Sequence, residues 1–126
     1  MADITPPVPQ GRQLIQGYGG GGFRIAGVAH TSSVIVFPDQ TLPWQTTSFD
    51  GLSVAALAPL MVEDIGVEVL LIGCGARMGM PRADIREALK EFSIVPEWMD
   101  TGAACRTFNV LLAEDRAVAA ALIAVE

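Results

Sequence analysis

The chain has 126 residues, of which 51% are hydrophobic and 17% charged, and its formal net charge is −6 with a pI near 4.6. This length and composition predict a single folded domain with little disorder. The acidic balance, with one lysine and scattered arginines, argues against nucleic-acid binding, because neutralising phosphates requires clustered Lys and Arg.

Targeting signals are not visible in the sequence. The longest apolar run, residues 117–125, is far shorter than the ~20 residues of a membrane helix. Asp3 and a proline-rich stretch stand where a basic leader region would be expected. The two cysteines, Cys74 and Cys105, make no disulfide framework. We therefore expect a cytoplasmic protein of a reducing compartment, without membrane insertion.

The N-terminal part is expected to begin with a disordered tail over residues 1–12, followed by one domain over residues 13–126. Leu14 and Ile15 are predicted to form a short strand. Four consecutive glycines, residues 19–22, follow, and no regular element tolerates such a run without entropic cost. They are interpreted as a flexible or tightly bent connection, and the alternative is a backbone cradle for an anion.

Two strand-like runs, residues 23–28 and 33–37, lie close enough to predict an antiparallel hairpin. His30 is the only histidine and falls near the predicted turn, so it is interpreted as a surface residue and not as a metal ligand. Residues 39–50 are expected to form a loop. Trp44 in this loop is expected to plug the core, and the alternative is an interface anchor.

The central pattern is a strand, a glycine-rich loop and a helix. Ser53 is a predicted N-cap for a helix that Pro59 interrupts. Residues 67–72 form an apolar run typical of a strand buried on both faces in a parallel sheet. After the glycines, Pro81 begins an amphipathic helix whose buried side is predicted to hold Ile85, Leu89 and Phe92.

The C-terminal half continues this alternation. Residues 94–99 are predicted as the next strand, in which Pro96 indicates an edge position or a strand end. An N-cap at residues 100–102 precedes a helix over residues 103–114, and residues 117–125 are predicted as the last strand. The resulting β-α-β-α-β order predicts an α/β fold with right-handed crossovers and a largely parallel sheet.

The loop over residues 73–79, GCGARMG, is the clearest candidate site. It resembles a dinucleotide fingerprint, but its glycines are spaced one residue too far apart and the helix begins too late for Gly79 to pack it against the strand. The looser interpretation is a small anion held by loop amides with Arg77 or Arg82 at the helix N-terminus. The alternative is a loop that only lets the strand and the helix pack closely.

The two cysteines are expected near the carboxyl edge of the sheet, where they can approach each other. They are interpreted as buried, inert thiols, because no histidine lies near them in the sequence.

A second polar cluster comprises Asp100, Thr101, Arg106, Thr107 and Asn109. The first two most simply cap the helix, whereas Arg106 and Asn109 share a helical side and can form a shallow polar pocket with Arg77. No catalytic pair, metal set or cofactor is predicted. The candidate ligand-binding residues are Gly73, Cys74, Gly75, Arg77, Asp100, Thr101, Arg106 and Asn109.

Four segments resemble the uncharacterised MTH-type domain family: residues 17–28, 33–38, 71–75 (LIGCG) and 99–116 (MDTGAACRTFNVLLAEDR). The resemblance covers about residues 14–124, and the family includes mitochondrial complex I assembly factor three and the adipogenesis-associated domain protein of animals. It implies a compact three-layer α/β domain with a mixed sheet and an extra β-layer from the N-terminal part. It also implies a bacterial cytosolic protein with no established catalytic residues. Position 74 is commonly Thr in the family, so Cys74 argues against an obligatory thiol.

The resemblance and the residues together predict a non-enzymatic assembly or interaction factor for a membrane-associated complex. The implied complexes are a respiratory NADH dehydrogenase or the protein-export machinery, and the implied location is cytoplasmic and peripheral to the inner membrane face. Protein subunits are the expected partners, and the apolar composition is compatible with self-association. The alternative function is binding or conversion of a small anionic metabolite at the Gly73–Gly79 loop.

Overall fold

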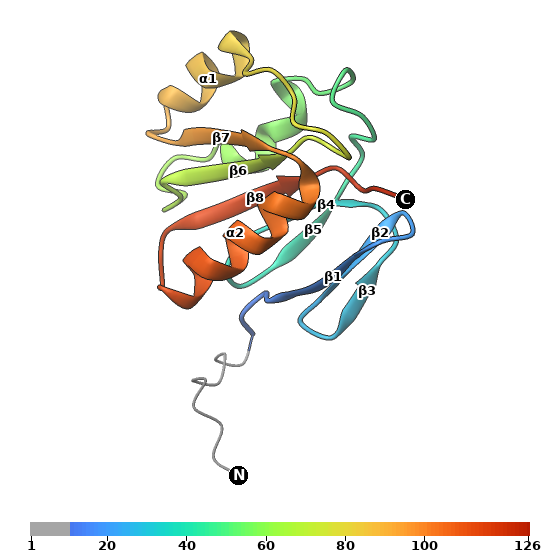
Figure 1. The fold of residues 1–126 in the computed structure, drawn as a ribbon. Helices are drawn as coiled ribbons and strands as arrows, with labels where there is room; N and C mark the ends of the chain where they lie inside the picture. The colour runs from blue at the N-terminus through green and yellow to red at the C-terminus, as the bar shows by residue number, and fades with distance from the viewer. Residues whose placement is uncertain (1–10) are drawn as a thin grey trace.

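The computed structural model describes residues 11–126, and Figure 1 shows how their strands and helices are arranged. Most of the predicted tail, residues 1–10, lies outside the described residues. Arg12, the last residue of that predicted tail, is held in place because its guanidinium donates hydrogen bonds to the Leu112 carbonyl oxygen at 3.2 Å and to Asp115 at 3.0 Å.

The larger sheet has five strands in the order β5-β4-β8-β6-β7. Strand β6 is parallel to both of its neighbours, β7 and β8, whereas β4 is antiparallel to β5 and to the central strand β8. The predicted mixed sheet with a parallel C-terminal part is therefore confirmed. The strand bounds are Ser33–Val36 (β4), Thr41–Trp44 (β5), Val69–Gly73 (β6), Val95–Met99 (β7) and Val118–Leu122 (β8).

The smaller sheet is a meander of β1 (Ile15–Gly19), β2 (Gly22–Ile25) and β3 (Val28–His30), and it forms the predicted extra β-layer. Gly20 and Gly21, with φ of 60° and 82°, make the tight turn between β1 and β2, so the bent-connection interpretation is confirmed. The predicted hairpin between residues 23–28 and 33–37 is wrong. The chain already reverses at Ala26 and Gly27, with φ of 50° and 81°, and β4 instead pairs within the larger sheet.

The two faces of the larger sheet are covered by different elements (Figure 1). Leu70 and Ile72 of β6 face a core shared with α1 (Ala83–Lys90) and the 3₁₀ helix η1 (Ala55–Leu60). Leu71 faces the opposite core, shared with α2 (Thr101–Ala113) and the smaller sheet. This alternation follows from the two-residue period of a strand, and it produces the three-layer α/β fold.

The chain from residue 39 to residue 60 differs from the prediction in two places. Residues 41–44 are the edge strand β5 and not a loop. Pro43 does not prevent this, because an edge strand tolerates a proline that has no N–H to donate. Trp44 is buried, and its indole nitrogen donates to the Ala56 carbonyl oxygen at 2.8 Å, which confirms its role as a plug. The helix predicted after Ser53 is only the short, kinked η1, with Pro59 inside it.

Candidate functional site

Three chain segments meet at the carboxyl end of β6, and Thr101 joins them. Its hydroxyl donates to the Ile123 carbonyl oxygen at 2.7 Å and accepts from the Gly75 amide at 3.0 Å, while its own amide donates to the Gly75 carbonyl oxygen at 2.8 Å. The Cys74 amide donates to the Met99 carbonyl oxygen at 2.8 Å. Thr101 is fully buried, so this junction fixes the start of the candidate loop against α2 and the end of β8.

The first turn of α2 lies beside the smaller sheet. Asp100 caps the helix by accepting from the Ala103 amide at 2.8 Å, as predicted. The Tyr18 hydroxyl of β1 lies directly over Gly102, where an added Cβ would be 2.5 Å from that oxygen. Arg106 donates to the same hydroxyl at 3.4 Å. Tyr18 was not predicted as a site residue. Its position as a lone aromatic residue among the glycines of residues 17–22 is the feature of the sequence that could have indicated it.

Asn109 points to β1 and holds its outer edge. Its side-chain oxygen accepts from the Ile15 amide at 2.9 Å, and its nitrogen donates to the Ile15 carbonyl oxygen at 2.8 Å. A side-chain amide pairs here with a strand as a neighbouring strand would. Asn109 and Arg106 thus contact the smaller sheet, and no hydrogen bond of the described residues joins either side chain to the Gly73–Gly79 loop.

The second half of the loop rests on an aromatic pair. Phe49 and Trp98 pack edge to face, with ring centroids 6.0 Å apart, and an added Cβ on Gly79 would lie 2.6 Å from the Phe49 ring. Arg77 and the neighbouring Met78 point to the exposed surface. Arg82 donates to the Leu52 carbonyl oxygen at 3.0 Å and pairs with Asp84.

The two cysteines do not approach each other, because they lie in the cores on opposite faces of the larger sheet. Both are free and buried. Burial raises the pKa of Cys74 and raises the pKa of Cys105 from 9.0 to about 12, because a thiolate is poorly solvated in an apolar core. Both thiols stay protonated near neutral pH, as the inert-thiol interpretation expects.

The candidate residues therefore lie in three different places. Gly73, Cys74, Gly75, Asp100 and Thr101 come together at the junction, where the Cys74 and Gly75 amides already have protein acceptors. Arg77 stands on the exposed loop, and the Arg106 and Asn109 side chains serve the smaller sheet. Binding of an anion by this loop stays a prediction.

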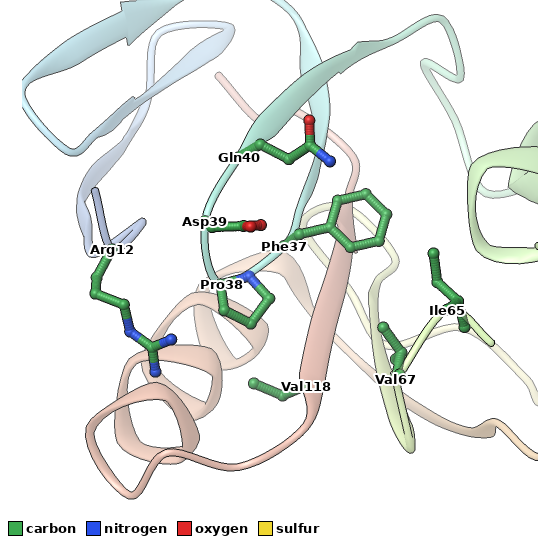
Figure 2. A pocket seen from close by; sticks show the side chains of 9 residues that line it. Arg12, Phe37, Pro38, Asp39, Gln40, Ile65, Val67 and Val118 are labelled. Atoms are coloured by element: carbon green, nitrogen blue, oxygen red, sulfur yellow. The ribbon is translucent and has the colours of Figure 1, made fainter. Parts of the chain in front are cut away.

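A pocket of about 370 Å³ lies at the other end of the parallel strands, where β6 and β8 begin. Figure 2 shows the Arg12 side chain on one side of it and Ile65 and Val67 on the other. Arg12 already pairs with Asp115 at 3.0 Å, and the lining contributes only one further charged residue, Asp39. Ligands of parallel sheets bind at the carboxyl ends of the strands, so this pocket is at the end opposite to the candidate loop.

The chemistry available beside the junction, at the start of α2, is hydrogen bonding by exposed side chains. Tyr18 and Arg106 are both exposed residues there. Over residues 11–126, no three His, Cys, Asp or Glu side chains gather as metal ligands. In the same part of the chain, no helix has both the length and the apolar content needed to cross a bilayer.

Known proteins resemble this chain over nearly all of the described region. Residues 15–123 match the family described as a protein of unknown function, DUF498/DUF598. An uncharacterised protein of Rhodobacter capsulatus is 39% identical over 109 residues, which cover 86% of this chain and 82% of that protein. The zebrafish (Danio rerio) NADH dehydrogenase (ubiquinone) 1 alpha subcomplex assembly factor 3 is 38% identical over 87% of this chain. The human factor of the same name is 28% identical over 86%.

The chain spans 63% of the zebrafish factor and 59% of the human factor. Among solved structures, a Bartonella henselae protein described as an outer membrane protein superposes with a TM-score of 0.85 at 44% identity, covering 93% of this chain and 98% of that one. A Bordetella pertussis protein described as an Mth938-like domain gives a TM-score of 0.80 at 25% identity, covering 98% and 92%.

Proposed function

We propose a function from one premise: the chain belongs to the DUF498/DUF598 family. This membership confirms the predicted resemblance to the MTH-type domain family. We propose that it is an assembly factor that binds protein subunits during the assembly of a membrane-associated NADH dehydrogenase. The observation that carries this proposal is the 38% identity, over 87% of this chain, to a zebrafish protein named for assembly of that enzyme.

The use of the polar groups supports a binding role over a catalytic one. The junction hydroxyl and amides hold the fold together, and both thiols are buried. Large apolar side chains are instead available on the surface: Met78 of the candidate loop is 66% exposed, and Met80, directly after the loop, is 78% exposed. Methionine is common at surfaces that bind other proteins, because its side chain is flexible and polarizable. We place the site of action at the cytoplasmic face of the inner membrane, peripheral to the complex under assembly.

Gene deletion tests this function. In the organism that encodes the chain, deletion is expected to lower the amount of fully assembled NADH dehydrogenase on native gels, with partly assembled intermediates in its place. Other respiratory complexes serve as the loading control, and a plasmid copy of the gene should restore assembly. Unchanged levels of NADH dehydrogenase and of the export machinery would contradict the proposal, whereas a defect confined to export would move the function to that machinery.

A further inference from the structure

We propose that the outer edge of β3 binds an extended segment of a partner protein, which adds a fourth strand to the smaller sheet. The partner segment is an apolar–acidic–apolar tripeptide within an extended stretch, with its carboxylate beside Arg24. This inference rests on the proposed function, since it names the surface and the partner chemistry of a protein-binding factor.

The edges of the larger sheet are unsuited to such pairing. The Val95 amide donates to the backbone carbonyl oxygen of Glu68, the residue before β6, so the next residue, Pro96, turns its backbone nitrogen outward from β7. At the other edge, the Phe37 amide donates to the Gln40 carbonyl oxygen, and the alternation from there turns Pro43 of β5 outward as well. A proline has no N–H to donate, so both edges are blocked at these positions.

The edge of β1 is covered. The Asn109 side chain of α2 occupies both hydrogen-bonding groups of Ile15, and α2 packs along this strand. Within residues 11–126, β3 is therefore the strand edge that has neither an outward proline nor a covering helix. Figure 1 shows β3 on the outside of the smaller sheet.

The backbone of Ala29 is directed outward at this edge. Ala26 and Gly27 form a two-residue turn, so the flanking Ile25 and Val28 form a hydrogen-bonded pair. The next pair, Arg24 and Ala29, is then non-hydrogen-bonded, and the N–H and C=O of Ala29 point away from β2. Ala29 is exposed, so an incoming strand can pair with these two groups, as in β-augmentation.

The charge around this edge selects the partner. Residues 13–38 contain no Asp or Glu, although the chain has 14 acidic residues and a net charge of −6. Arg24 lies opposite Ala29 on the same face, and its guanidinium donates to the Gly27 carbonyl oxygen at 3.1 Å beside β3. No described carboxylate forms an ion pair with it. A partner carboxylate opposite Ala29 can reach the free donors of Arg24 over the small alanine methyl.

The other face of the edge carries the apolar Val28 and the partly exposed His30. Val28 and His30 lie opposite Ile25 and Phe23, which are buried in the core, whereas Val28 is 55% exposed. The neighbours of the partner's acidic residue would project to this face, because strand side chains alternate. An apolar residue there would cover Val28, which completes the apolar–acidic–apolar pattern.

A peptide titration tests the proposal. The probe is the synthetic peptide Thr-Thr-Val-Glu-Val-Thr-Thr, added to the ¹⁵N-labelled full chain up to millimolar concentration, and its control carries Lys in place of Glu. We expect chemical-shift changes and slowed exchange of the Ala29 amide, centred on β3 and Arg24, with at least about tenfold weaker binding of the Lys peptide. No shifts, or shifts centred on another element, would overturn the proposal.

Two variants keep the test specific. Ala29→Pro removes the outward N–H without disturbing a ladder bond, so it should abolish binding, whereas the matched Ala29→Ser should bind as the wild type does. Arg24→Gln should retain the fold and bind the Glu and Lys peptides about equally. This variant tests the edge of β3 even if Ala29→Pro does not fold. Equal binding by wild type and Ala29→Pro would overturn the proposal. Peptide binding with normal NADH dehydrogenase in the deletion strain would instead refute only the assembly function.

Discussion

Thr101 shows how one buried hydroxyl can fix a loop, a helix start and the end of a strand. Its two side-chain hydrogen bonds, to Ile123 and Gly75, are both lost in Thr101→Val, which keeps the side-chain shape. Because unsatisfied buried groups remain, we expect a loss of about 2 kcal/mol in the free energy of unfolding, measured by urea denaturation. Thr101→Ser should restore most of it. The matched Thr107→Val on the same helix should change stability little, and an equal effect at both positions would contradict this role.

The buried thiol of Cys105 should make the free energy of unfolding depend on pH. Its folded-state pKa of about 12 exceeds the ordinary 9.0 because of burial, so above pH 9 the unfolded chain loses this proton first and stability falls as pH rises towards 12. The contribution is at most about 1.4 kcal/mol per pH unit. In Cys105→Ala, the decline in the free energy of unfolding between pH 9 and 11 should be shallower by roughly that slope. Parallel curves for the two proteins would refute the assignment.

Local and distant contacts explain which site residues the sequence revealed. The Asp100 cap was predictable because it acts on an amide three residues away. The linking role of Thr101 was not, because its partners lie 22 and 26 residues away. The contact of Arg106 with Tyr18 spans 88 residues, and nothing in the local pattern of either residue indicates it.

At the scale of elements, Asn109 attaches the smaller sheet to α2. Its two bonds to Ile15 are lost in Asn109→Ala, so we expect faster hydrogen exchange at β1 and a stability loss of about 1–2 kcal/mol. Hydrogen-exchange mass spectrometry with urea denaturation measures both. Arg106→Ala is the control, because its one hydrogen bond in the described chain is an exposed contact at 3.4 Å. Unchanged exchange at β1 in Asn109→Ala would show that packing alone holds this layer.

The outward prolines of β5 and β7 predict a change in association. Replacing Pro43 and Pro96 with Thr gives both edges a free N–H, and open edges favour strand pairing between molecules. We expect the double variant to stay folded and to self-associate more than the wild type in sedimentation velocity at rising concentration. Pro81→Thr, in the exposed segment before α1, should behave as the wild type. If the double variant matched the wild type, the prolines would not protect these edges.

The C-terminal elements were predictable because their patterns are strong: the run over residues 67–72 and the stripe of Ile85 and Leu89 correspond to β6 and α1. The pairing of the N-terminal strands was not, since they have three to five residues each and one reversal uses Ala26, a residue type that rarely adopts positive φ. β5 was not predicted, because Pro43 indicates a loop when the position of the strand in the sheet is unknown. Proline is compatible with a strand only at an edge, at a strand start or at a bulge.

At the scale of the molecule, the chain is an α/β domain whose polar junction is used to hold the fold, with an accessible edge on its smaller sheet. The assembly factors it resembles are longer, since it spans 63% of the zebrafish factor. The proposed function therefore concerns what this domain binds, and we propose two separate surfaces for binding: the edge of β3, and the exposed Met78 and Met80.

Affinity purification tests the central claim most directly. The tagged protein, expressed at its native level in its own host, is recovered from gently solubilised cells, and co-purifying proteins are quantified by mass spectrometry against a tag-only control. We predict recovery of NADH dehydrogenase subunits in amounts comparable to the tagged protein. Recovery of the protein alone would contradict the assembly function and direct the search for a ligand to the Gly73–Gly79 loop.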